Sequence, residues 1–214
     1  MNNYGKLYNR YIKRMIDFPV ALLLIIVLLP VFFILSLIIM LSSGRPVLYI
    51  AERGGYHGRT FRIYKFRTMI KNADQAGGGT SALNDQRITK VGNILRKTKL
   101  DEFPQLFNIL KGDMSFVGPR PELIKYTAGY SQEELIILEV RPGITDYSSL
   151  TFINLDILVG ERNADEVYEN EILPVKNKLR MKYAETVSFP TDCRLLCITV
   201  IKVLQKAFHY ITHR

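Results

Sequence analysis

Two adjacent carboxylates are the residues of this sequence best suited to chemistry. Asp101 and Glu102 begin the stretch Leu-Asp-Glu-Phe-Pro-Gln-Leu-Phe-Asn, in which Pro104 suits the first turn of a helix. A helix N-terminus attracts anions, and one carboxylate of such a pair can attack phosphorus while the other holds Mg²⁺ or moves a proton. Taken alone, the stretch favours a plainer interpretation, an N-cap aspartate beside a solvated glutamate.

An anionic substrate would also need cations near the carboxylate pair. The basic residues that are candidates to join it are Lys65, Arg67, Arg96 and Arg120. Arg120 stands between two prolines in Gly-Pro-Arg-Pro, a rigid turn that restricts the backbone from which its side chain extends. The carboxylate pair and these cations together describe a site for a phosphorylated substrate.

The element most distinct from an ordinary domain is an apolar run over residues 18–41. None of its 24 residues is charged and 21 are apolar, so as a helix it could cross a hydrocarbon core of about 30 Å. Pro30 lies at its midpoint and weakens a helix there. Each half could also reach the middle of the bilayer and turn back.

The charges on both sides of the run bear on its path. Lys and Arg are frequent before and after it, whereas the positive-inside rule expects them in the cytoplasm. A re-entrant helix broken at Pro30 keeps both flanks on the cytoplasmic side and is therefore favoured. A straight span with a kink remains open, because membrane helices tolerate proline.

Composition limits the remaining classes of protein. The chain has 214 residues, 48% hydrophobic and 23% charged, with a formal net charge of +9. These values exclude a disordered chain and a polytopic membrane protein. The charge by itself also fits a membrane-anchored, non-enzymatic adaptor that binds nucleic acid or anionic lipid. The two cysteines form no disulfide framework or metal motif.

Periodicity predicts short helices and one β-hairpin after the apolar run. The expected strands are 46–51 and 60–66, and the expected helices are 88–99, 100–111, 131–140 and 164–184. Residues 192–214 form a basic amphipathic helix, which fits a membrane surface or, alternatively, a domain core. The expected fold is mostly α with a small β-hairpin (α+β).

Several motifs together resemble the bacterial sugar transferase family, the monotopic phosphoglycosyl transferases. In the family's order and spacing they are Lys65-Phe-Arg-Thr-Met69, Asp85-Gln-Arg-Ile-Thr89, Val91-Gly92, Leu95-Arg96, Leu100-Asp-Glu-Phe-Pro-Gln-Leu-Phe-Asn108, Lys111-Gly-Asp-Met-Ser-Phe-Val-Gly-Pro-Arg-Pro121 and Arg141-Pro-Gly-Ile-Thr145. With the membrane element, the resemblance covers about residues 10–146. A chance match to so many motifs is negligible.

The resemblance implies transfer of a sugar-1-phosphate from a UDP-sugar to polyprenol (undecaprenyl) phosphate, with release of UMP. This reaction is the first membrane step of a bacterial surface glycan, such as a capsule, exopolysaccharide or O-antigen. The resemblance makes Asp101 the nucleophile that forms a phosphoryl-aspartate, and Glu102 its partner in binding Mg²⁺ and handling protons. The implied substrate-binding residues are Lys65, Arg67, Arg87, Arg96, Gln105, Asn108, Arg120 and Arg141.

The resemblance also implies a monotopic protein of the bacterial inner (plasma) membrane, with a Pro-broken re-entrant N-terminal helix and amphipathic interfacial helices. Its expected parts are a basic flank and re-entrant helix over 1–44, a catalytic domain on the cytoplasmic face over 45–190, and a basic amphipathic helix over 191–214. The expected partners are the UDP-sugar, undecaprenyl phosphate, an anionic lipid bilayer and downstream glycosyltransferases, but not nucleic acid. A homodimer is left open.

Two stretches depart from the family pattern. The helix break often shows Ser-Pro, whereas this chain has Leu29-Pro30 and lacks that hydroxyl. After Thr145, most members continue with Gly and an aromatic-Ala-Gln-Val-Asn-Gly-Arg stretch, whereas this chain has Asp146-Tyr-Ser-Ser-Leu-Thr-Phe152. That region is expected near the nucleotide or sugar of the donor, so the sugar and the glycan pathway are not assigned. Asp146 either contacts a sugar hydroxyl or amine, or is a turn residue.

Overall fold

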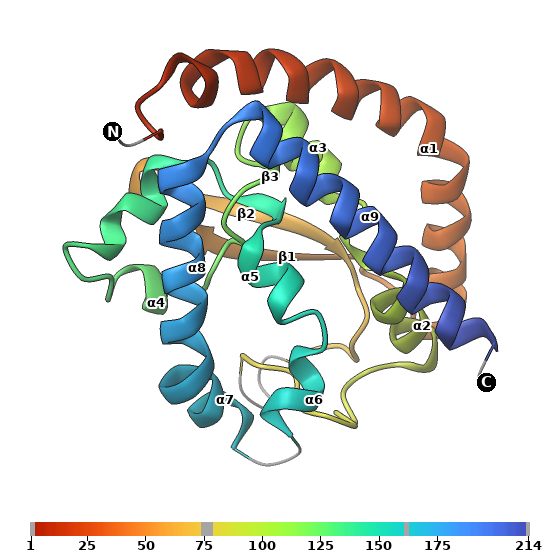
Figure 1. The fold of residues 1–214 in the computed structure, drawn as a ribbon. Helices are drawn as coiled ribbons and strands as arrows, with labels where there is room; N and C mark the ends of the chain where they lie inside the picture. Colours follow the sequence, from red (N-terminus) through yellow and green to blue (C-terminus); the bar gives the residue numbers. More distant parts are fainter. Residues whose placement is uncertain (1–2, 74–78, 161–162, 213–214) are drawn as a thin grey trace.

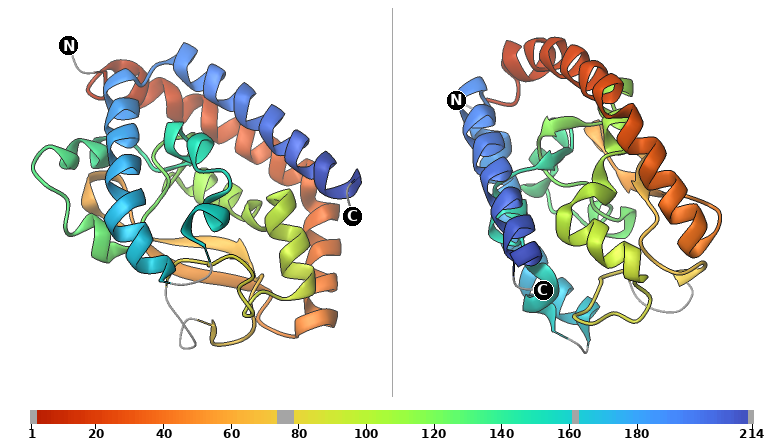
Figure 2. Two further views of the ribbon diagram at one scale, coloured as in Figure 1. Left: turned by 60° about the horizontal axis from the view of Figure 1, so that its bottom comes forward. Right: turned by 90° about the vertical axis from the view of Figure 1, so that its right-hand side faces the viewer.

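Helices dominate the computed structural model, which describes residues 3–73, 79–160 and 163–212. A long helix, α1 (Lys13–Ser43), arches over two sides of a body built from shorter helices and small sheets (Figure 1, Figure 2). The predicted fold, mostly helical with a small antiparallel hairpin and one long apolar N-terminal helix, is confirmed.

Helix α1 contains the whole apolar run and follows a π-helical turn at Tyr8–Ile12. It continues through Pro30 instead of ending there, and it changes direction part of the way along its length (Figure 1). Its inner side packs on the body, whereas only 11% of its most apolar stretch, with a mean hydropathy of 3.4, is buried. Its length and composition suffice to cross a membrane, and the re-entrant path remains a prediction.

The hairpin consists of β1 (Leu48–Gly54) and β2 (Thr60–Phe66). The strands pair Leu48 with Phe66 and Gly54 with Thr60. The second strand has its predicted bounds, whereas the first was predicted at 46–51 and is shifted toward the C-terminus. Antiparallel pairing along the whole of β2 sets the bounds of β1. The pattern of apolar residues carries no information about this pairing.

The predicted helix over 100–111 is wrong in its first turn. Helix α2 (Lys90–Thr98) ends at Lys99, whose backbone is left-handed with φ 60°. Leu100–Glu102 then form a 3₁₀ turn, and α3 (Gln105–Lys111) begins after Pro104. An α-helix from residue 100 would need an N–H at Pro104, which proline lacks. Gly112 ends α3 as predicted, with φ 94°.

A second small sheet was not predicted. Its strands, β3 (Ser115–Val117) and β4 (Gly143–Thr145), pair in parallel and are too short to give a periodic signal. The backbone after β3 and the backbone before β4 approach so closely that a Cβ on Gly118 would lie 2.2 Å from the Arg141 carbonyl oxygen. Only glycine fits there.

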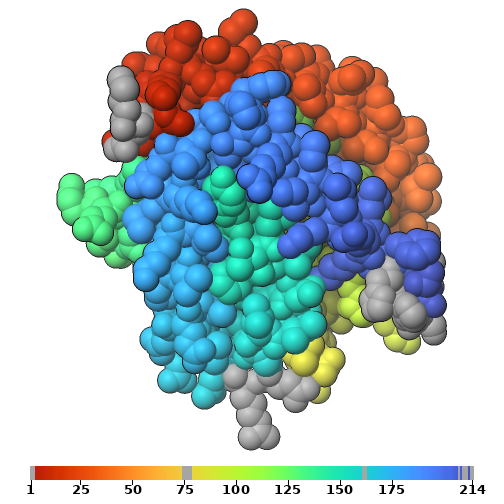
Figure 3. Space-filling view, viewed as in Figure 1, coloured from red at the N-terminus to blue at the C-terminus, as the bar shows by residue number. Residues whose placement is uncertain are grey.

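The remaining helices close the body on the face that Figure 3 shows. They are α4 (Ile124–Thr127), α5 (Tyr147–Thr151), α6 (Leu155–Val159), α7 (Ala164–Val167), α8 (Leu173–Thr186) and α9 (Phe189–Thr212). The predicted helix over 164–184 corresponds to α7 and α8, joined by a π-helical turn at Tyr168–Ile172. The predicted helix over 131–140 is instead a 3₁₀ segment, Glu134–Glu139, that runs into extended backbone shortly before Pro142.

Helix α9 is amphipathic, as predicted. One side of its apolar band packs on the body, and docking of the other side on a membrane surface remains a prediction. Leu195 is buried against the body. On the other side an apolar stripe with a spacing of four residues is exposed. This α9 stripe consists of Leu196, Val200, Leu204 and Phe208. Cys193 and Cys197 are free thiols, also exposed.

A buried polar cluster fixes α1 to α8 and α9 at one end. The ammonium group of Lys13 forms an ion pair with Asp192 and donates to the Tyr183 hydroxyl at 2.9 Å. Tyr183 and Tyr8 each donate to Asp192 at 2.7 Å. Lys13 and Asp192 are nearly inaccessible, so this ion pair ties the two helices with exposed apolar sides into one unit.

Candidate active site

The adjacent carboxylates lie in the 3₁₀ turn between α2 and α3. Asp101 and Glu102 are each only 7% exposed. Lys99, which ends α2, and Pro104, which begins α3, bound the turn on its two sides. The pair is therefore held in a short rigid connection between two helices and does not lie within the first turn of one.

Glu102 is held by two cations that come from other elements. Nη1 of Arg120 donates to Oε2 at 2.9 Å, and Nη2 donates to Oε1, which makes a two-point contact. Nζ of Lys65, near the end of β2, lies 3.8 Å from Oε1. Bidentate guanidinium–carboxylate pairs are among the stronger hydrogen-bonded contacts in proteins. The structure thus brings together four of the predicted site residues.

The two carboxylates differ in how readily they ionise. Burial by itself raises the pKa of Glu102, but Arg120 and Lys65 outweigh burial and hold this pKa well below its usual value. Burial and the neighbouring charge of Glu102 raise the pKa of Asp101. Oδ1 of Asp101 is buried and has no hydrogen-bond partner among the described residues. Asp101 is therefore the carboxylate that is available to a substrate.

Lys65 and Arg96 add positive charge around Asp101. Burial lowers the pKa of Lys65 to about 8, and Glu102 opposes that shift. Arg96, on α2, donates from Nε to the Thr68 hydroxyl at 2.9 Å and from Nη1 to the Ser81 hydroxyl at 2.8 Å. Burial lowers the pKa of Arg96 while Asp101 raises it, which places the two side chains within electrostatic reach.

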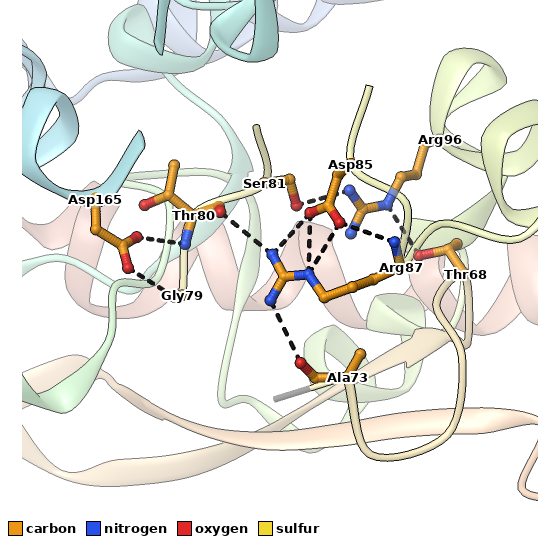
Figure 4. Close-up of polar contacts among 9 residues, drawn as sticks. All are labelled: Thr68, Ala73, Gly79, Thr80, Ser81, Asp85, Arg87, Arg96 and Asp165. Carbon is orange, nitrogen blue, oxygen red and sulfur yellow. Dashed lines mark hydrogen bonds and ion pairs between the residues drawn. The ribbon is translucent and has the colours of Figure 1, made fainter. Parts of the chain in front are cut away.

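Figure 4 shows how the connection between β2 and α2 is held near Arg96. Nη2 of Arg87 lies 2.7 Å from Asp85, and Nη1 donates to the carbonyl oxygen of Ala73 at 3.3 Å, so Arg87 ties residues 73 and 85 of this connection together. Asp165 of α7 accepts from the backbone N–H of Thr80 at 2.7 Å. These contacts of Arg87 hold the loop, and its predicted contact with substrate remains a prediction.

Arg67 and Arg141, also expected at the substrate, make structural contacts. Nη2 of Arg67 donates to the carbonyl oxygens of Ser43 and Gly44, the latter at 2.7 Å, and so caps the end of α1. Nε of Arg141 donates to the Gly112 carbonyl at 3.3 Å, at the end of α3. Both arginines secure helix ends. Nε and Nη1 of Arg67 are buried without a partner among the described residues, and the predicted contacts of both arginines with substrate remain predictions.

Asn108 and Gln105 are fully buried on α3. The Asn108 amide accepts from the N–H of Tyr64 at 3.0 Å and donates to the carbonyl of Arg62 at 2.7 Å, which fastens α3 to the edge of β2. The side-chain amide of Gln105, one helical turn after Asp101, has no partner for either atom within the described residues. Asn108 is therefore committed to the fold, whereas Gln105 keeps its polar groups unused.

Lys99 was missed from the sequence, and Asp146 is now placed. Lys99 favours ionisation of both Asp101 and Glu102, and the available signal was a lysine at a helix end where glycine is common. Asp146 is fully buried and caps α5, where its carboxylate accepts from the N–H of Ser149 at 2.7 Å. Of the two alternatives for Asp146, the structure favours the turn residue.

The carboxylate pair suits Mg²⁺ together with a substrate. No cluster of three or more His, Cys, Asp or Glu side chains occurs within residues 3–73, 79–160 and 163–212. Mg²⁺ is, however, commonly held by one or two carboxylates together with substrate phosphates and water. The buried, unpartnered Oδ1 of Asp101 fits such a ligand. Glu102 fits less well while both of its oxygens bind Arg120.

The sequence is similar to known proteins over most of its length. The family model described as bacterial sugar transferase matches residues 8–206. The chain is 37% identical over 194 residues to an uncharacterized sugar transferase, EpsL, of Bacillus subtilis (strain 168), which covers 90% of this chain and 87% of that protein.

Two further relatives carry names that state a reaction. The UDP-N-acetylgalactosamine-undecaprenyl-phosphate N-acetylgalactosaminephosphotransferase of Aeromonas hydrophila is 39% identical over 143 residues, 65% of this chain and 34% of the relative. The UDP-glucose:undecaprenyl-phosphate glucose-1-phosphate transferase of Escherichia coli (strain K12) is 33% identical over 197 residues, 91% of this chain and 40% of the relative. The chain thus spans less than half the length of these two proteins.

Proposed function

The chain belongs to the bacterial sugar transferase family, and from this premise we propose that it transfers a sugar-1-phosphate from a UDP-sugar to undecaprenyl phosphate. The observation that carries the proposal is the buried carboxylate pair. Arg120 binds Glu102, whereas Oδ1 of Asp101 has no partner in the part of the chain that the structure describes. The relatives named for this class of reaction act with N-acetylgalactosamine and with glucose.

Asp101 is the nucleophile in this proposal. Its ionised oxygen attacks the phosphorus that carries the sugar, the bond from that phosphorus to the bridging oxygen breaks, and UMP leaves. A phosphate oxygen of undecaprenyl phosphate then attacks the same phosphorus. This second step frees Asp101 and yields the polyprenyl-diphosphate-sugar. The raised pKa of Asp101 suits the role, because a more basic carboxylate is a better nucleophile once it is ionised.

The surrounding cations stabilise the charge of the diphosphate. Three cations favour the ionised form of Asp101, namely Lys65, Lys99 and Arg96. The same cations would offset the negative charge on the reacting phosphoryl group. Arg120 keeps Glu102 ionised and oriented. Mg²⁺, which Asp101 would hold together with the phosphates, would neutralise charge on the diphosphate and ease the departure of UMP.

The acceptor is a lipid phosphate, so the nucleophile must act at a membrane surface. The exposed side of α1 and the α9 stripe supply the apolar contacts. In this proposal α1 is a re-entrant helix in the bacterial inner membrane, and the body lies on its cytoplasmic face. Downstream glycosyltransferases would extend the product.

The test uses the purified chain in lipid nanodiscs with undecaprenyl phosphate and a panel of UDP-sugars. UMP release and an organic-soluble product are expected with at least one donor. Without the acceptor, peptide mass spectrometry should find a sugar-phosphate adduct on Asp101. Asp101→Asn should lose the adduct and turnover, whereas Asp113→Asn, outside the pair, should keep both. An active Asp101→Asn variant that forms no adduct would refute the proposal.

A further inference from the structure

A second buried ionic cluster lies two residues beyond Arg120. Glu122 is 9% exposed and Arg180 is fully buried. Oε1 of Glu122 accepts from Nη2 of Arg180 and from the hydroxyl of Tyr168. Nζ of Lys176 lies 3.9 Å from the same oxygen. The mechanism proposed above gives this cluster no role. Folding nevertheless withdraws the three charged side chains of the cluster from water.

The cluster holds one end of the segment that carries Arg120. The backbone carbonyl of Glu122 also accepts from the N–H of Gly54 at 3.1 Å, so β1 grips the same residue that α8 grips through its side chain. At the other end of the segment, the N–H of Gly118 donates to the carbonyl of Thr145 at 2.8 Å. Arg120 is thus suspended between two anchored points.

The residues between these points leave the backbone little freedom. Pro119 and Pro121 fix φ on both sides of Arg120, and the carbonyl of Pro119 accepts from the N–H of Gly143 at 3.0 Å. The guanidinium of Arg120 then meets Glu102 in a two-point contact, which depends on direction as well as distance. A shift of either anchor would misdirect this contact.

A buried ionic contact costs desolvation free energy that an apolar contact in the same place would not cost. Replacing a buried ion pair with apolar residues of similar size is often neutral or stabilising, whereas removing one partner is strongly destabilising. A directed ionic contact fixes orientation in a way that an apolar contact does not. We propose that Glu122, held by Arg180 and Tyr168, is a positioning residue that orients Arg120 toward Glu102. This inference rests on the transfer reaction proposed above.

The test is a double-mutant cycle between Glu122→Gln and Arg120→Ala, measured as kcat/KM for the UDP-sugar in nanodiscs. Glu122→Gln alone should lower kcat/KM by about 10- to 100-fold, the effect of misplacing a catalytic group by about 1 Å. In the Arg120→Ala background it should cost less than about twofold, because residues that act together are not additive. The effect of Glu122→Gln on the thermal unfolding midpoint should be equal with and without Arg120→Ala.

The control is Asp192→Asn, which breaks the buried ion pair with Lys13 and removes no contact of residues 118–122 themselves. Its effect on kcat/KM should be the same with and without Arg120→Ala. If Glu122→Gln fails to fold, Tyr168→Phe removes one hydrogen bond to the same oxygen and enters the same cycle. If Arg120→Ala is too slow to measure, Arg120→Lys replaces it.

Equal losses from the Glu122 or Tyr168 change in both backgrounds would overturn the inference, and so would an unchanged kcat/KM for Glu122→Gln alone. A wild-type chain that makes no product with any UDP-sugar contradicts the proposed function instead. The two failures are therefore distinguishable.

Discussion

Deprotonation of Lys65 should cause the fall in kcat/KM at alkaline pH. Burial lowers the pKa of this ammonium group to about 8, and kcat/KM reports groups of the free enzyme. The protonated form carries the charge that faces Glu102, and in the proposed function the same charge would face a bound phosphate. Activity should therefore be near its plateau at pH 7 and fall as the pH rises, to about a tenth of the plateau at pH 9, since each unit above the pKa removes tenfold of the charged form.

Lys65→Arg provides the matched comparison, because arginine does not titrate in this range. The variant should keep its activity between pH 8 and pH 9, whatever its absolute rate. Both enzymes share the ionisation of the substrate, so any limb that differs between them belongs to residue 65. The assay is UMP release over pH 6 to 10 at low UDP-sugar concentration. An alkaline limb at the same pH in both enzymes would contradict the assignment.

Three other predictions concern stability and the membrane. Asp146→Ala should lower the free energy of unfolding by about 1–2 kcal/mol by removing a helix cap and leave the KM for UDP-sugar unchanged, whereas a residue that contacts the sugar would raise KM. Lys13→Met should cost about 3 kcal/mol by leaving Asp192 buried without its cation, and the double variant Lys13→Met/Asp192→Asn should regain part of that loss in thermal unfolding. Cys193 and Cys197 should react with a membrane-impermeant maleimide slowly in nanodiscs and quickly after denaturation, and fast labelling in nanodiscs would place α9 away from the lipid.

Sequence patterns predicted the elements whose formation depends on residues close to one another in the chain. The alternation of β2, the apolar run of α1 and the glycine that ends α3 each depend on neighbours a few residues away. The parallel pair β3 and β4 could not be read in this way, because Ser115 pairs with Gly143 across a long stretch of chain. The 3₁₀ turn at Asp101 depends on the missing N–H of Pro104, which is visible in the sequence.

The candidate site shows the same division. The motifs pointed to Lys65, Glu102 and Arg120, and the structure places them in contact. They predicted substrate contacts for Arg67 and Asn108 as well, and the described hydrogen bonds of these two side chains go to the end of α1 and to β2. Their contact with substrate stays a prediction, because a motif alone does not separate a residue that holds the fold from one that binds substrate.

The end of β2 lies next to two parts of the molecule that the proposed function would keep at a set distance. Lys65 meets the carboxylate pair, and Arg67, two residues later and just beyond β2, donates to the Gly44 carbonyl at the end of α1. Two residues of extended chain span about 7 Å. In the proposed function this stretch would therefore set the distance between α1 in the membrane and Asp101. One inserted residue would turn one of the two side chains to the opposite face and would so change the height of Asp101 relative to α1.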